Sequence, residues 1–174
     1  MKTLIKKEFR LALHPTVPLF WLLSAMLIIP NYPYYVAFFY TTLGLFFVCL
    51  TGRENRDIQY SMLLPVSRRD VVRGRFAFAA IVECVQVICA LPFAVLRAHL
   101  VSAPNAAGMD ANTALFGLAL IMLGLFNIVF FPRYYSAPDK VGGAFVRGSI
   151  AVFLYIALAE TAAHVLPFAR DQLD

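Results

Sequence analysis

Five apolar stretches run through the sequence, and together they restrict the chain to a membrane fold. A helix that crosses the hydrocarbon core needs roughly 20 residues, within a range of about 17–25. The first stretch is the shortest, and Pro15 and Pro18 should bend the chain where it begins. None shows the alternation of a membrane β-strand, so we predict an all-α polytopic integral membrane helix bundle with about five spans. The five apolar stretches are residues 17–30, 34–51, 76–96, 115–131 and 150–166. We assign the whole chain, residues 1–174, to a single transmembrane domain.

The composition excludes a free-standing soluble enzyme. Hydrophobic residues make up 61% of the chain and charged residues 14%, whereas a soluble domain has roughly 45–50% and about 25%. One small core does not hide such an excess, because a domain of about 150 residues still leaves about 30% of its surface exposed.

The basic residues are distributed unevenly between the connections. Thirteen of the 15 lie before the first stretch, between the second and third, or between the fourth and fifth. Basic loops stay in the cytoplasm, so we expect the N-terminus and these two connections there, with Arg97 and Arg170 on the other side. Topology then accounts for the net charge of +5, and no nucleic acid is needed as a partner. The thirteen are Lys2, Lys6, Lys7, Arg10, Arg53, Arg56, Arg68, Arg69, Arg73, Arg75, Arg133, Lys140 and Arg147.

Residues 1–14 form a predicted amphipathic helix before the first span. Apolar residues recur at helical spacing against a basic face, so this helix should lie in the membrane interface among lipid head groups. An ordinary cytoplasmic anchor beside the first span is the alternative, and both interpretations give the same location. The apolar positions are Leu4, Ile5, Phe9, Ala12 and Leu13, and the charged ones are Lys6, Lys7, Glu8 and Arg10.

The connection between the second and third spans contains a predicted helix, a break and a second helix start. Residues 53–64 form the first helix, with Ile58, Met62 and Leu63 on one face. Pro65 disfavours helix at the residue before it. Ser67 and Asp70 resemble a capping box, in which the hydroxyl accepts an early backbone N–H and the carboxylate lies at the positive helix end.

Two interpretations of this elbow remain open. A capped span whose arginines obey the positive-inside rule explains part of the pattern. The positive-inside rule does not explain the mixture of positive and negative charges before Pro65. Such mixed charges suit docking on another protein. These charged residues are Arg53, Glu54, Arg56 and Asp57.

With these features in this order, the chain resembles permease subunits of the type-2 ABC exporter family, in its short bacterial form. Residues 64–72 read L-P-V-S-R-R-D-V-V, which is typical of that group, and the resemblance covers roughly residues 1–150. In that family the segment between the second and third spans is a coupling helix, which sits in a groove of a separate ATPase subunit.

The resemblance implies a role for each part of the elbow. Residues 53–64 would be the cytoplasmic coupling helix, Pro65 and Ser67 its hinge to the third span, and the charged residues after the hinge would brace the cytoplasmic ends. The implied docking residues are Arg53, Glu54, Arg56, Asp57, Ile58, Met62, Pro65, Ser67, Arg68, Arg69 and Asp70.

The chain has no motif of its own for binding ATP. It lacks G-x-x-x-x-G-K-[ST] and any Gly-Lys pair, so the backbone cradle for phosphates is missing. The chain is then not itself an enzyme and carries no cofactor. The resemblance implies a partner ABC ATPase subunit that binds ATP and Mg, and a second permease copy or a paralogue.

The resemblance also implies a location and a span count. We expect the bacterial plasma (inner) membrane, a multi-pass topology and a cytoplasmic N-terminus. Family members usually have six spans with both ends in the cytoplasm, whereas residues 167–174 are too short for a sixth crossing. Either the C-terminus is external or the chain is shortened.

Polar residues inside the spans are a second group of candidates. A charge at the bilayer centre costs about 2.5–3.5 kcal/mol on insertion scales, so a charged residue inside a span is a candidate for a functional or structural role. There are two such pairs, Glu83 with Gln86, and Glu160 with His164 at positions i and i+4. Each pair is interpreted in one of two ways. It belongs to a proton relay or the polar lining of a transport path, or it makes hydrogen bonds that fix helix packing. Asn127 is interpreted as a packing residue.

The cysteines and two further connections complete the predictions. Cys49, Cys84 and Cys89 are interpreted as small apolar fillers, and no metal site is expected. Residues 132–149 should form a loop that makes a second, smaller cytoplasmic contact, with Tyr134 and Tyr135 in an aromatic belt. Residues 31–33 should form a tight external hairpin.

Three functions follow from these features. We favour the membrane subunit of an exporter for an amphipathic peptide, drug or lipid-like substrate. A non-transporting scaffold or immunity protein is the alternative, because the sixth span is missing. A small lipid-modifying enzyme is the third, and the scatter of His14, His99 and His164 over both membrane faces argues against it.

Overall fold

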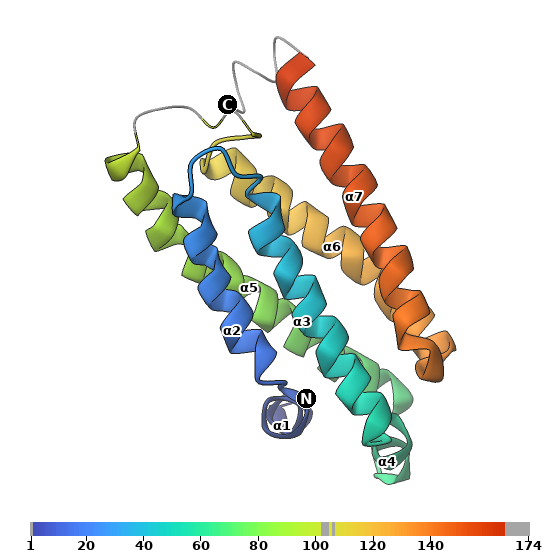
Figure 1. Cartoon of the computed structure of the whole chain (residues 1–174). Coiled ribbons are helices and arrows are strands. Elements are labelled where there is room, and N and C mark those ends of the chain that lie inside the picture. Colours follow the sequence, from blue (N-terminus) through green and yellow to red (C-terminus); the bar gives the residue numbers. More distant parts are fainter. Residues whose placement is uncertain (1, 102–104, 106, 166–174) are drawn as a thin grey trace.

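The computed structural model describes residues 2–101, 105 and 107–165, and this part of the chain is helical without strands (Figure 1). Four helices are long and apolar enough to cross a membrane, and the bent N-terminal pair makes a fifth if it counts as one span. The predicted all-α polytopic bundle is therefore confirmed. In chain order the elements are α1 (Lys2–Lys7), η1 (Glu8–Ala12), α2 (Thr16–Leu22), η2 (Leu23–Ile28), α3 (Tyr35–Glu54), α4 (Asp57–Leu63), α5 (Arg68–Leu100), α6 (Thr113–Ser136), η3 (Pro138–Lys140) and α7 (Val141–Val165).

The N-terminal helix lies across the bundle. Residues Leu4–Ala12 and Thr16–Ile28 meet at 86°, and α1 is seen end-on in Figure 1. Leu13 is extended at the corner, and Pro18 falls in the first turn of α2, where the missing N–H costs no helical hydrogen bond. This is the orientation of a helix in the membrane interface.

The first span has few residues, but part of it is a 3₁₀-helix, which has a larger rise per residue than an α-helix. It combines the seven residues of α2 with the six 3₁₀-helical residues of η2. With rises of about 1.5 and 2.0 Å per residue it reaches about 22 Å, most of a hydrocarbon core of about 30 Å. Its side chains hold it against α5, since Trp21 Nε1 donates to the Val82 carbonyl at 3.2 Å.

The third span is longer than predicted and begins at the predicted cap. Ser67 Oγ accepts the Asp70 backbone N–H at 3.1 Å and donates to the Asp70 carboxylate at 2.7 Å. The capping box is therefore confirmed. From this cap α5 runs for 33 residues, so its first turns extend the bundle beyond the apolar stretch.

The prediction of a loop over residues 132–149 is wrong. Helix α6 continues to Ser136, η3 follows, and α7 already starts at Val141. Gly142 and Gly143 cost about 1 kcal/mol each in a helix, but Val141 and Ala144 are buried against the bundle, and tertiary packing overrides propensity. Tyr134 is also fully buried rather than in an aromatic belt.

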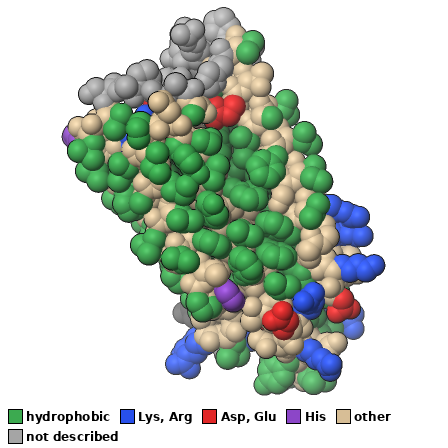
Figure 2. All heavy atoms as spheres, in the orientation of Figure 1, with side chains coloured by type: hydrophobic (Ala, Val, Ile, Leu, Met, Phe, Trp, Pro, Cys, Tyr) green, Lys and Arg blue, Asp and Glu red, His purple; other side chains and the backbone are tan. Residues whose placement is uncertain are grey.

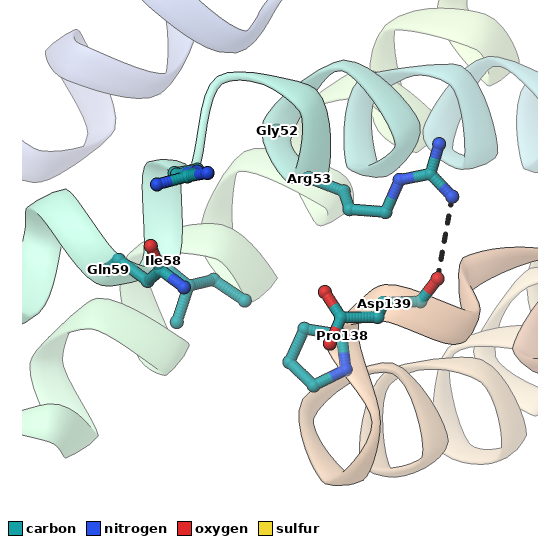
Figure 3. Close-up of a pocket in the computed structure, with 7 residues that line it drawn as sticks. Gly52, Arg53, Ile58, Gln59, Pro138 and Asp139 are labelled. Atoms are coloured by element: carbon teal, nitrogen blue, oxygen red, sulfur yellow. Dashed lines mark hydrogen bonds between the residues drawn. The ribbon is translucent and has the colours of Figure 1, made fainter.

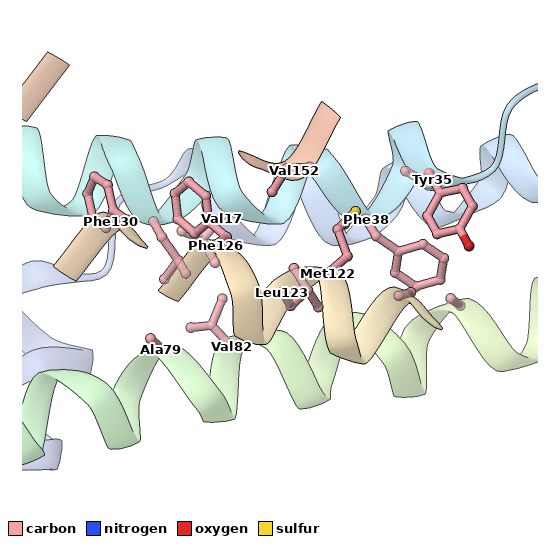
Figure 4. Close-up of a cluster of buried hydrophobic side chains, with 14 of the residues drawn as sticks. Val17, Tyr35, Phe38, Ala79, Val82, Met122, Leu123, Phe126, Phe130 and Val152 are labelled. Carbon is pink, nitrogen blue, oxygen red and sulfur yellow. The ribbon is translucent and has the colours of Figure 1, made fainter. Parts of the chain in front are cut away.

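Aromatic side chains fill the core between the long helices (Figure 4). Phe126, Phe130 and Tyr134 follow one face of α6, with stacked rings 5.0 and 5.9 Å apart. Other large apolar side chains remain on the outside of α5 and α7, including Ile88, Leu154 and Leu158. Figure 2 shows an apolar surface over much of the molecule. Such a surface fits a protein surrounded by lipid.

Polar connections cap the two ends of the bundle. We call the end formed by η1, α4, the start of α5 and η3 the basic end, because most Lys and Arg side chains gather there (Figure 2). At the opposite end, the predicted hairpin is confirmed by Asn31, whose φ is 55°. Asn105 joins this hairpin by donating from Nδ2 to the Tyr32 carbonyl at 2.9 Å. Arg97 is buried there and pairs with Asp110 at 2.8 Å.

Candidate docking site at the basic end

The predicted helix over residues 53–64 is two pieces. Arg53 and Glu54 are the last residues of α3, and α4 begins only at Asp57. Between them Arg56 has φ 52°, a left-handed conformation that breaks the helix and costs about 1–2 kcal/mol for a residue with a Cβ. The single-helix prediction is therefore wrong, because the chain changes direction at this residue.

Helix α4 and the residues that follow it expose apolar side chains. Tyr60, Met62, Leu63 and Val66 are all exposed, and Leu63 reaches 85%. We call these four residues the α4 patch. Ile58, which was predicted on the same face as Met62, packs instead against the core. In the sequence the patch is flanked by exposed charged residues, Arg53, Glu54 and Arg56 before α4 and Arg68 and Arg69 after it.

Four charged residues anchor α4 to the rest of the bundle, and we call them the Asp57 cluster. Asp57 pairs with Lys7 of α1 at 2.7 Å and with Arg75 of α5. Glu8 of η1 pairs with the same two cations, at 3.2 Å from Lys7 and 3.0 Å from Arg75. Two cations and two carboxylates balance, which is how buried charges are tolerated.

The cluster is buried, and the sequence did not reveal it. The side chains of Arg75 and Glu8 are 3% exposed, and that of Asp57 is 16% exposed. Lys7 also donates to Ser61 Oγ at 2.9 Å, inside α4. Lys7, Glu8 and Arg75 were assigned to the membrane interface or to topology. One signal was present: Glu8 is the sole acidic residue before Glu54.

The other predicted docking residues lie around α4. Arg53, Glu54, Arg56, Arg68 and Arg69 are exposed, and Arg53 lies 3.7 Å from Glu54. Such exposed pairs contribute little stability, which leaves these side chains free to meet a partner. Pro65, Ser67 and Asp70 instead form the break and the cap that set where α5 begins.

A cavity of about 340 Å³ opens between the break before α4 and η3 (Figure 3). It is lined by Gly52, Arg53, Arg56, Ile58, Gln59, Pro138 and Asp139. Arg53 donates across it to the Asp139 carbonyl at 3.4 Å, which links positions 86 residues apart in the sequence. The two connections of the basic end therefore form one surface.

The intramembrane polar residues make separate interhelical contacts. Asn127 Nδ2 lies 2.8 and 2.9 Å from the two carboxylate oxygens of Glu83, and Gln86 donates to Ser24 Oγ at 3.0 Å. These contacts tie α5 to α6 and to η2. They match the packing alternative for Glu83 and Gln86.

Glu160 belongs to a different part of the molecule. At the opposite end it accepts the Met109 backbone N–H at 3.2 Å, and Gly108 lies so close that an added Cβ would be 2.9 Å from the carboxylate. The side chain of His164 lies outside the described residues. The structure therefore does not join Glu160 to Glu83 and Gln86.

The three cysteines lie in different environments. Cys49 is buried, as expected of an apolar filler, but Cys84 is exposed on the surface of α5 and Cys89 is half-buried. Among the described residues, no group of three or more His, Cys, Asp or Glu side chains is placed to hold a metal ion.

Comparison with known proteins adds one finding. A family model described as ABC-2 family transporter protein matches residues 3–168. That range includes the Asp57 cluster, the α4 patch and all the long helices. No curated protein and no solved structure matches the chain.

Proposed function

The chain belongs to the ABC-2 family of transporter proteins, and we propose that it is the permease subunit of an ABC exporter. In this role it spans the membrane, while a separate subunit binds ATP and Mg and hydrolyses the nucleotide. The cargo is an amphipathic peptide, a drug or a lipid-like molecule. A second copy of the chain or a paralogue completes the path.

The α4 patch is the observation that carries this proposal. Exposed apolar side chains grouped among charged ones mark sites of protein–protein contact. A partner that binds here needs a recess for Leu63 and Tyr60, which protrude from a helix of only seven residues. A short rigid helix of this kind suits the groove of a motor subunit.

The Asp57 cluster supports a mechanical role for α4. A displacement of α4 acts through Asp57 on Lys7 and Arg75, and so on α1 and α5 together. Packed elements joined in this way move as rigid bodies instead of deforming continuously. Closure of the ATPase would then tilt the N-terminal helix and the third span in one step.

The charge distribution supports the orientation. We place the basic end in the cytoplasm, where ATP is available, because Lys and Arg concentrate on cytoplasmic connections. The opposite end, with residues 29–34, 105 and 107–112, then faces outward. For this family we place the protein in the inner membrane of a bacterium.

Co-purification tests the proposal. The tagged chain is expressed with the P-loop protein that we expect from an adjacent reading frame, and retention of that protein in detergent is measured. Tyr60→Ala with Leu63→Ala should abolish retention, because it truncates the two most exposed of the four side chains in the α4 patch. The matched control is Phe153→Ala with Leu158→Ala, which truncates two similarly exposed side chains on the lipid-facing surface of α7.

The outcomes separate clearly. Retention by the wild-type chain and by the α7 control, with loss in the α4 variant, supports the docking role. Equal retention by both variants would contradict it. A wild-type chain that retains no ATPase subunit would overturn the permease assignment itself.

A further inference from the structure

The cavity between α4 and η3 has the size and position of a binding site. Its volume of about 340 Å³ lies within the range of ligand pockets, roughly 300–1,000 Å³. Ile58 and Gln59 of α4 form part of its wall (Figure 3). A partner that docks on α4 is therefore close to the cavity, because α4 itself forms part of the cavity wall.

The cavity carries excess positive charge. Arg53 and Arg56 line it, against one carboxylate, that of Asp139. Within the described part of the chain Arg56 makes no ion pair, and the contacts of Arg53 are the exposed 3.7 Å approach to Glu54 and the 3.4 Å hydrogen bond to the Asp139 carbonyl. In contrast, Lys7 and Arg75 nearby are already paired inside the Asp57 cluster. Arg53 and Arg56 are thus the cations of the cavity wall that a ligand in the cavity would meet.

The backbone at Arg56 is a second, independent observation. A φ of 52° is uncommon for any residue but glycine, and asparagine is the next best choice. An arginine here keeps a strained backbone and places a guanidinium at the cavity. Strained residues of this kind gather at binding sites and switch regions.

We propose that this cavity receives an acidic side chain of the ATPase subunit, which pairs with Arg56 and Arg53. A guanidinium binds a carboxylate through two parallel N–H donors, so the contact fixes orientation as well as position. The ATPase then grips both connections of the basic end, α4 through apolar packing and η3 through the shared cavity. This inference rests on the permease function proposed above.

The experiment measures the apparent Kd between the purified chain and the purified ATPase subunit in detergent. Arg56→Glu should weaken binding about tenfold or more, because it sets like charges against each other. Raising the salt from about 0.1 to 1 M shortens the Debye length from about 10 to 3 Å, so the difference from wild type should shrink. Arg147→Glu is the control, since Arg147 is an exposed cation at the same end that does not line the cavity.

A second variant tests the sign of the occupant's charge. Asp139→Asn removes the one carboxylate of the cavity wall and should not weaken binding, because an acidic occupant loses a repulsive neighbour. If Asp139→Asn weakens binding while Arg56→Glu does not, the occupant is a cation and the proposal is overturned.

The remaining outcomes distinguish a failure of the cavity contact from a failure of the permease role. If Arg56→Glu and Arg147→Glu bind like wild type while the α4 variant does not, the permease role stands and the cavity contact is wrong. If Arg56 matters only when phosphatidylglycerol vesicles replace detergent, a lipid head group fills the cavity and the proposal fails. A wild-type chain that binds no ATPase refutes both proposals together.

Discussion

At the scale of single residues, Arg75 lies between two carboxylates that come from different elements. Glu8 belongs to η1 and Asp57 to α4, and the Arg75 side chain is 3% exposed. A buried ion pair adds little net stability, because desolvation offsets the attraction, but removing one partner leaves an uncompensated buried charge. The cluster therefore matters most for keeping α1, η1, α4 and α5 in one arrangement.

Arg75→Gln should lower the free energy of unfolding by about 3–5 kcal/mol. Glu8 and Asp57 would then share a buried site with only Lys7 to balance them. Thermal unfolding in detergent measures the loss. The control is Arg73→Gln, which changes an exposed arginine of the same helix and should stay within about 0.5 kcal/mol of wild type. Equal stability of the two variants would show that the Asp57 cluster does not contribute to the stability of the fold.

At the scale of elements, α6 and α7 are tightly packed at Gly148. A Cβ added there would lie 2.8 Å from Phe126 Cε2 and 2.9 Å from Cδ2, which is too close for ordinary contact. Small residues allow such close approach between membrane helices. The stacked aromatic rings of α6 hold Phe126 in place, so the ring has little room to move away.

Gly148→Ala should therefore destabilise the protein by about 1–3 kcal/mol through overpacking. Gly143→Ala in the same helix should be neutral or stabilising, because nothing lies within 4 Å of an added Cβ there and alanine favours helix. Unfolding midpoints of the two variants, measured side by side, check this. A neutral Gly148→Ala would mean that the two helices are not packed as described.

The sequence predicted the elements where a local rule decides them. Ser67 and Asp70 fixed the start of α5, and Pro65 fixed the end of the helix before it. It failed where packing decides: Gly142 and Gly143 suggested a loop, but burial of Val141 and Ala144 makes this segment the start of α7. The left-handed Arg56 was also missed, since no propensity favours arginine in that conformation.

At the scale of the whole molecule, the two ends differ in charge and in construction. The basic end combines the Asp57 cluster, the α4 patch and the cavity, whereas the opposite end is closed by connections that meet at Asn105 and Tyr32. The mixed charges of residues 53–57 suggested a docking surface, and the resemblance to the exporter family extended that prediction to residue 70. Lys7, Glu8 and Arg75 escaped prediction because the contacts that join them to Asp57 depend on the tertiary fold.

Cysteine labelling in intact cells tests the orientation. In a chain without its three native cysteines, Val66→Cys should resist a membrane-impermeant maleimide, because we place α4 and its hinge in the cytoplasm. Ala107→Cys should react, since Ala107 is exposed at the opposite end. Both should react after the cells are permeabilised. The reverse pattern would show that the basic end faces outward, where α4 could not contact a cytoplasmic ATPase.

The central claim is that α4 is held by a separate ATP-hydrolysing subunit. The most direct measurement places a photo-crosslinking amino acid at position 63, the most exposed point of the α4 patch, in cells that express both proteins. We expect a crosslink from position 63 to the ATPase subunit and none from position 158 on the lipid-facing side of α7. Crosslinks from position 63 that reach only lipid, or only a second copy of the chain, would contradict the account.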